Sequence, residues 1–313
     1  MPTQEEQLEA VRLAALSAAN SAQNAALSAQ ATAIAAQNSA NSLEAKTAKD
    51  ITNASMLGLL SELNEAVRYT HQALSLSRGI VPGSTVVQIV GYNPDIDVGL
   101  TPEDIWEEGG NYPFQTTDRT LEVASNNADD SASGTGLRAV RVVGLNSAYD
   151  EITEDVVLSG TTPVTLVNQY FRINTLFGLN VGSHKVNIGK IVLRVAGGGA
   201  IQAIIGAGGG ASQKAIYTVP ANKTAFITHC EFQIIRPGNG DFAGLKLHFN
   251  VVGQADIGRA VFSLLDSNPN YQRIFAHPLL VPEKSDIRIS ASFVSDNDTE
   301  VYVNLTLILI NNT

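Results

Sequence analysis

The residues whose types could support chemistry are few and lie apart in the sequence. Histidine can act as an acid–base group or a metal ligand, and the chain has five histidines without metal-ligand spacing: His71, His184, His229, His248 and His277. His229, Cys230 and Glu231 are adjacent, but successive side chains of a strand point to opposite faces. No nucleophile elbow, Walker loop or His-Glu-x-x-His zinc motif occurs. We therefore predict a non-enzymatic protein with no catalytic, cofactor-binding or metal-binding residues.

Acidic residues form two clusters. The first contains no basic residue and comprises Asp95, Asp97, Glu103, Asp104, Glu107 and Glu108. The second is Asp129 and Asp130, which follow two asparagines. Calcium prefers clustered oxygen ligands, and two carboxylates across a groove can hydrolyse a glycosidic bond. No EF-hand spacing is present, so solvated acidic loops are the simpler interpretation. A structural Ca²⁺ and a depolymerase that cleaves host polysaccharide are the alternatives.

Trp106 is the only tryptophan, and it lies in a run that combines aromatic and acidic residues with a Gly-Gly turn, Asp104 to Phe114. Aromatic faces can stack on the apolar faces of sugars. We expect a plug of the core or a contact between subunits in preference to a sugar-binding platform.

Composition divides the chain into two unlike parts. Of the 47 residues from Leu8 to Ala54, 17 are alanine, whereas the chain after Gly79 is rich in Gly, Val, Ile and Thr. The net charge of −10 argues against a non-specific binder of nucleic acid. One cysteine excludes an intramolecular disulfide framework. No apolar run approaches the ~20 residues that span a bilayer, and we expect no signal peptide.

The first part, residues 1–79, is predicted to be a helical attachment or oligomerisation segment. Alanine is the best helix former, and Thr3 and Glu6 have the spacing of a capping box. Gly79 and Pro82 end the helical pattern, and Gly58 is the expected break within it.

Two repeats in this segment predict a partner for the helix. Val11, Ala15 and Ala18 recur eleven residues later as Ala22, Ala26 and Ala29, and an eleven-residue repeat gives straight or slightly right-handed supercoils. From Met56 the apolar positions have heptad spacing. We predict a self-associating or docking helix, with a lone linker or an intramolecular hairpin as alternatives. The predicted assembly seam comprises Val11, Leu16, Leu27, Ile34, Met56, Leu60, Leu63, Val67 and Leu74.

The second part is predicted to form two antiparallel β-sandwich or jelly-roll-like domains. Short runs such as Arg138 to Val143 alternate polar and apolar residues, and turn formers separate them. Two glycine triplets, 197–199 and 208–210, suggest domains at 80–200 and 201–313. Residues 80–200 carry 14 acids and 7 bases, so the acidity lies mostly in the middle domain. The predicted fold class is therefore α+β in separate segments.

Two features together resemble structural proteins of tailed bacteriophages. The run Ser17 to Gln30, rich in Ala, Ser, Asn and Gln, resembles the coiled-coil shafts of phage fibres. The runs Asp104 to Phe114, Thr120 to Ser125 and Gly144 to Ile152 resemble β modules of tailed-phage proteins, including those of marine and cyanobacterial phages. The run Tyr217 to Ile227 resembles the opening of a virion β-sandwich.

The resemblance implies a homotrimer with an N-terminal helical attachment and a distal β head. We expect a tail or neck fibre of the virion, assembled in the bacterial cytoplasm. The expected partners are its own copies and another virion protein such as an adaptor, portal or capsid protein, with a host cell-surface glycan as a further expectation. No nucleic acid, membrane insertion or cofactor is expected. A capsid decoration or head fibre protein is the nearest alternative.

Overall fold

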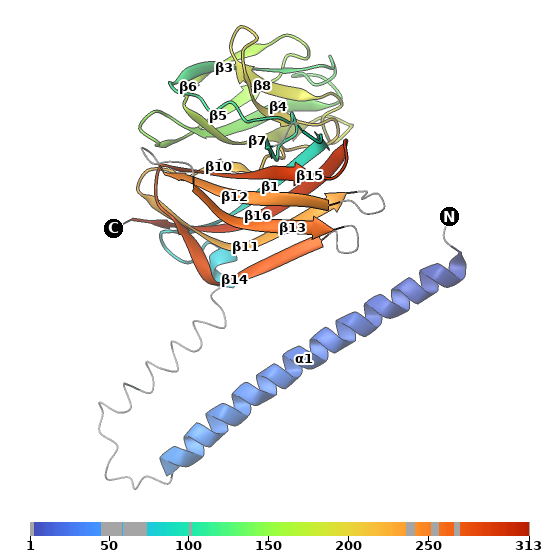
Figure 1. The fold of residues 1–313 in the computed structure, drawn as a ribbon, viewed down its shortest axis with the longest axis vertical. Helices are drawn as coiled ribbons and strands as arrows, with labels where there is room; N and C mark the ends of the chain where they lie inside the picture. The colour runs from blue at the N-terminus through green and yellow to red at the C-terminus, as the bar shows by residue number, and fades with distance from the viewer. Residues whose placement is uncertain are drawn as a thin grey trace. The chain divides into compact units, whose positions relative to one another are not determined.

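The computed structural model describes residues 3–44, 58, 74–99, 102–235, 242–251, 257–265 and 270–312. The chain divides into two compact units, Met1–Ala73 and Leu74–Thr313. The described part of the first unit is helical, and the second unit is built from antiparallel strands (Figure 1). This order confirms the prediction of a helical segment followed by β domains. Within the described part of the chain, no helix is long and apolar enough to cross a membrane.

The helix α1 spans Gln4–Glu44. Its start is the predicted capping box, because the Glu6 amide donates to Oγ1 of Thr3 while the Thr3 amide donates to Oε2 of Glu6 at 2.7 Å. The predicted heptad from Met56 to Val67 lies outside the described residues. Gly58 itself is helical, and the residues next to it are not described.

The strands of the second unit form two sandwiches. One of them, the inserted sandwich, stacks the sheet β6-β3-β8-β9 on the sheet β5-β4-β7. Its core contains residues from both sheets, such as Leu121 and Val142. In chain order, its strands are β3 (Arg119–Ser125), β4 (Leu137–Leu145), β5 (Glu151–Val157), β6 (Val164–Tyr170), β7 (Arg172–Val181), β8 (Ile191–Val195) and β9 (Ile201–Ile205).

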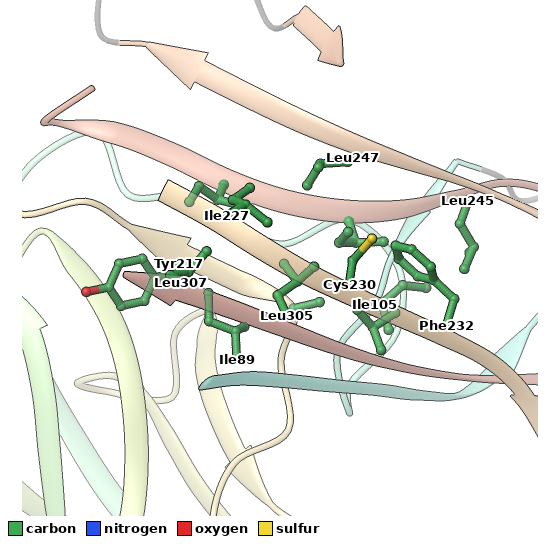
Figure 2. Packing of buried hydrophobic residues seen from close by; sticks show 14 of the residues in the cluster. Ile89, Ile105, Tyr217, Ile227, Cys230, Phe232, Leu245, Leu247, Leu305 and Leu307 are labelled. Atoms are coloured by element: carbon green, nitrogen blue, oxygen red, sulfur yellow. The ribbon is translucent and has the colours of Figure 1, made fainter. Parts of the chain in front are cut away.

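The other, the terminal sandwich, stacks the sheet β1-β16-β11-β14 on the sheet β10-β15-β12-β13. Figure 2 shows side chains of both sheets, such as Ile227 and Leu247, meeting in its core. Its strands are β1 (Ser84–Ile96), β2 (Glu103–Asp104, paired with β15), β10 (Ile216–Thr218), β11 (Lys223–Ile235), β12 (Phe242–Val251), β13 (Ile257–Leu265), β14 (Asn270–Val281), β15 (Ser285–Val294) and β16 (Thr299–Asn311).

The strands sort into the two sandwiches differently from the predicted division at residue 200. β1 pairs along its length with β16, from Ser84 opposite Ile310 to Asn93 opposite Val301. β9, which begins at Ile201, pairs with β8 of the other sandwich. The inserted sandwich is therefore an insertion between β2 and β10. The first glycine triplet is the turn that joins β8 to β9, where Gly197 and Gly198 adopt positive φ.

Asp130 organises the loops at one end of the inserted sandwich. Its fully buried carboxylate accepts hydrogen bonds from Oγ of Ser125 at 2.6 Å and from the amides of Leu137, Ile188 and Gly189 at 2.8–2.9 Å. Burial opposes ionisation, but these hydrogen bonds outweigh it and hold the pKa of Asp130 below its ordinary value. The Asp130 carboxylate thus holds three loop segments together, as an apolar core would elsewhere.

Replacing Asp130 with Ala should lower the free energy of unfolding by at least about 2 kcal/mol at pH 7, because buried amides lose their acceptor. The depressed folded pKa means that this stabilisation is complete above the unfolded pKa of about 3.9 and disappears as the pH falls through the folded value. Urea unfolding at pH 7 and pH 3 measures both effects. The exposed neighbour Asp129, changed to Ala, is the control, and an equal loss in both variants would contradict this role.

Candidate functional site

The described residues of the predicted seam do not lie on one side of α1. At about 100° per residue, Leu16, Leu27 and Ile34 share one side, which also carries Leu13. Val11 lies on the opposite side with the repeating alanines. All four predicted seam residues on α1 are exposed in the single chain. Met56, Leu60, Leu63 and Val67 lie outside the described residues, and Leu74 is an exposed residue of the second unit.

The acidic residues of the first cluster do not form one site. Asp95 and Asp97 meet Asp298, with one carboxylate oxygen of each within 4.8 Å of the others. A hydrogen bond with Asp298, together with the partial desolvation and neighbouring negative charges, raises the pKa of Asp95. These carboxylates face solvent wholly or in part, and we assign no metal to them. The approach of Asp298 could not be foreseen, because it is about 200 residues away in sequence.

Trp106 is only 3% exposed and belongs to a small core with Tyr112 and Ile216. Its ring meets the Tyr112 ring edge-on at 5.1 Å, and its indole Nε1 donates to the Gly110 carbonyl at 3.1 Å. This burial confirms the expected core plug.

The run His229, Cys230 and Glu231 in β11 is strand packing, as predicted. Cys230 is fully buried, whereas its two neighbours face the other side of the sheet. Burial raises the pKa of the Cys230 thiol to about 12, so the thiol stays protonated and is a poor nucleophile at neutral pH.

Among the described residues, buried charge is concentrated where the two sandwiches meet. We call this cluster the junction, and it comprises Asp104, Tyr112, Arg172, Lys214, Asp286 and Arg288. At its centre, the Arg172 guanidinium donates to both carboxylate oxygens of Asp286, at 2.9 and 3.0 Å. The two side chains are only 10% and 9% exposed. Arg172 comes from β7 of the inserted sandwich and Asp286 from β15 of the terminal sandwich, so the pair fastens one sandwich to the other.

Neighbouring groups form further contacts with both members of this pair. Nη1 of Arg172 donates to the Gln115 carbonyl at 2.6 Å, and the guanidinium carbon lies 4.1 Å from the ring centre of Phe171. Oγ1 of Thr218 donates to Asp286 at 2.6 Å. Asn174 in turn exchanges two hydrogen bonds with the backbone of Thr218. Buried charges need such complete pairing to persist.

Lys214 lies beside the ion pair in the segment that returns from the inserted sandwich. Its ammonium group donates to the Ile173 carbonyl and to the Tyr112 hydroxyl. Burial, with Arg172 adding repulsion, lowers the pKa of Lys214 to about 7, although Asp286 acts in the opposite direction.

A second ion pair completes the junction at the start of the insertion. Nη1 of Arg288 in β15 donates to Oδ1 of Asp104 at 2.7 Å, and the other oxygen of Asp104 accepts from the Tyr112 amide at 2.8 Å. The junction is thus largely buried and its charges are paired within the chain, which suits it to joining domains. No sequence motif marks Arg172, Lys214 or Asp286, because the groups that they contact lie far away in the sequence.

Comparison with known proteins adds little to this geometry. No family model matches the chain, and no curated protein matches it. Among solved structures, the VP2 subviral particle of infectious bursal disease virus is 11% identical over 76% of each chain, with a TM-score of 0.20. The structure of the Gx strain of that virus is 9% identical over 73% of each chain, also with a TM-score of 0.20. Scores this low carry no argument about fold or function.

Replacing Arg172 with Met should lower the free energy of unfolding by about 3–5 kcal/mol, because Asp286 then stays buried without its partner. The double variant Arg172→Met/Asp286→Leu should be more stable than Arg172→Met alone. The exposed bidentate pair of Arg141 and Asp155, 39% and 49% exposed, gives a matched control. Arg141→Met should cost under about 1 kcal/mol, and equal losses measured by urea unfolding would refute the importance of the junction.

Lys214 should make stability depend on pH. Its unfolded pKa is about 10.4 and its folded pKa is about 7. Between these values the unfolded chain binds more protons, so this group makes the protein more stable as the pH rises from 7 to 10. The difference in unfolding free energy between the wild type and Lys214→Met should therefore shift in favour of the wild type over this range. A difference independent of pH would show that the lysine keeps its ordinary pKa.

Proposed function

We propose that the chain is a non-enzymatic structural protein of a bacteriophage virion, a homotrimeric tail or neck fibre. In this proposal the N-terminal helices join sister chains and attach them to another virion protein. The β unit projects outward and contacts the host surface. The observation that carries the proposal is the long helix α1, whose large apolar side chains are exposed along its length.

The exposed side chains of α1 require a partner. The helix has 41 residues, about 60 Å at 1.5 Å per residue, and Leu16, Leu27 and Ile34 are 51–55% exposed. An isolated helix gains little stability from its own hydrogen bonds in water, and most helices are stabilised by packing an apolar face. Association along this side would bury its largest apolar side chains.

The spacing on this side is that of an interhelical seam. Residues 13, 16, 20, 23, 27, 31, 34 and 38 follow one another at intervals of three or four. Leu13, Leu16, Leu27 and Ile34 supply the large apolar side chains of this side. Asn20 and Asn38 supply polar layers. A polar layer costs stability but fixes register and the number of strands. We assign this side, the leucine side, to contacts between sister chains.

The opposite side, the alanine side, is lined by small residues at the eleven-residue repeat, including Ala15, Ala22, Ala26 and Ala33. Small side chains permit close approach of another backbone over a long distance but bury little area per residue. Polar stripes separate the two sides, with Ser17, Ser21 and Ser28 on one flank. Two apolar sides fit a helix that meets its sisters on one side and the particle on the other.

The proposal predicts that the full chain has about three times the 33.1 kDa mass of one copy by light scattering. Changing Leu16 and Leu27 together to Asp should convert it to a monomer, because the charges would lie in the seam. Ser17→Asp with Ser28→Asp is the matched control, since it adds the same charges at the same spacing on a polar flank. A monomeric wild type with a helical circular-dichroism spectrum would overturn the trimeric shaft.

The position of the chain in the virion and its enzymatic activity need separate experiments. Electron microscopy of particles that carry a labelled chain should place the label on the tail or neck. A label on the capsid would favour a decoration or head-fibre role. Turnover of host surface polysaccharide by the purified protein would reject the non-enzymatic proposal.

A further inference from the structure

A cleft of about 490 Å³ lies between the two sandwiches. Residues 87–90 of β1 line it from the terminal sandwich, and Val143, Glu151 and residues 174–175 line it from the inserted sandwich. Residues 211–214 of the returning segment also line it. Cavities of this size between domains are where proteins commonly bind small ligands, through an apolar lining and a few polar groups.

The β1 wall of the cleft carries backbone groups without partners. In an antiparallel strand the N–H and C=O of one residue point to the same neighbour, and successive residues alternate. The register of β1 on β16 has no shift over residues 84–93. The Tyr92 amide points away from β16, because it donates to the Gln213 carbonyl at 3.4 Å. Gln88 and Val90 therefore also turn their N–H and C=O groups away from β16, where no described residue bonds to them.

The hydroxyl of Tyr217 is a further polar group in this cleft. Its ring belongs to the core of the terminal sandwich, and the residue is 6% exposed. Figure 2 shows the hydroxyl at the end of the ring that points away from Ile89 and Leu305. Tyr217 also lines the cleft, and its hydroxyl has no hydrogen-bond partner within the described part of the chain. A nearly buried hydroxyl without a partner costs free energy that a bound ligand would recover.

The Tyr217 hydroxyl can both donate and accept a hydrogen bond. Burial, with the negative charge of Glu151 adding to it, raises the pKa of Tyr217. The hydroxyl therefore keeps its proton at neutral pH.

The charged side chains that line the cleft already have partners in the chain. The Lys214 ammonium donates to the Ile173 carbonyl and to the Tyr112 hydroxyl. The Glu151 carboxylate lies 3.9 Å from the Lys223 ammonium. The groups left for a ligand are thus uncharged donors and acceptors, and they call for an uncharged ligand with groups of both kinds.

The form of the β1 wall favours the hydroxyls of a sugar over a peptide strand. A peptide strand would pair with alternate residues along the edge, but the Gln213 carbonyl already occupies the Tyr92 amide. Hydroxyls on neighbouring carbons suit a short stretch of N–H and C=O groups, because each hydroxyl both donates and accepts. Val90 and Val143 add apolar wall for the C–H groups of a sugar ring.

We propose that this cleft binds a short uncharged saccharide, whose hydroxyls bond to the backbone of Gln88 and Val90 and to the hydroxyl of Tyr217. The inference rests on the proposed contact of the β unit with the host surface, and it names a neutral saccharide as the class of ligand. It does not depend on the trimer, because every group in the cleft belongs to one chain.

Saturation-transfer NMR on the full-length protein tests this. The probes are the methyl glycosides of glucose, galactose, mannose, rhamnose and N-acetylglucosamine, and at least one should receive saturation. Tyr217→Phe keeps the ring in the core and removes the hydroxyl, so it should weaken binding about fivefold, the factor expected from one net hydrogen bond. Tyr170→Phe, in the core of the inserted sandwich and outside the cleft lining, is the matched control and should bind like the wild type.

A second pair of variants tests the location of the site. Ala211 is exposed and lines the cleft, so Ala211→Trp should fill it and abolish saturation transfer. Ala207→Trp adds the same side chain to the returning segment outside the lining and should have no effect.

Three results would overturn the inference. They are no transfer to any glycoside, unchanged binding by Ala211→Trp, and transfer only to an acetylated and amidated alanine tetrapeptide offered in parallel. Any of these results combined with a label on the tail or neck of the virion would leave the proposed fibre standing.

Discussion

The ion pair between Arg172 and Asp286 is the constraint on which the arrangement of the β unit depends. A buried charge without a partner costs several kcal/mol, and here each charge comes from a different sandwich. The two sandwiches therefore cannot separate or rotate relative to each other without exposing these two charged groups to solvent or leaving them without their partner. Thr218, Asn174 and the Gln115 carbonyl hold the pair in its bidentate geometry, so specificity of docking is encoded in hydrogen bonds as well as in apolar contact.

The same constraint explains how a sandwich can be inserted into another. The chain leaves the terminal sandwich after β2 and returns at β10, and both connections pass through the junction. Asp104 and Tyr112 lie on the outgoing segment, and Lys214 lies on the returning segment. Glu107 joins the two segments, since its carboxylate accepts from the amides of Gly206 and Gln213 at 3.1 Å. Two crossings bonded to each other leave the inserted sandwich little freedom to swing.

The sequence predicted what depends on neighbours along the chain and missed what depends on distant ones. Alternation in Arg138 to Val143 and the capping box of Thr3 and Glu6 are local patterns, and both appear as expected. The pairing of Ser84 with Ile310 is not local. The glycine triplet at 197–199 therefore predicts a domain boundary where the chain only turns from β8 to β9. Arg172 and Asp286 are 114 residues apart, and no periodicity connects them. The helical angle per residue is enough to assign each residue of α1 to one of its two sides. The predicted seam nevertheless combines Val11 from one side with Leu16 and Leu27 from the other.

The single chain leaves uncovered two apolar surfaces of a kind that proteins normally cover. α1 exposes leucines on one side, and the edge strand β14 exposes the large apolar side chains of Ile274 and Leu280. A monomer with these features would tend to aggregate. The net charge of −10 opposes indiscriminate association, whereas a helical seam of matched side chains would still permit one geometry. Exposed apolar surface and excess charge together therefore support the proposed assembly, in which the buried junction would hold the two sandwiches of each subunit in one arrangement.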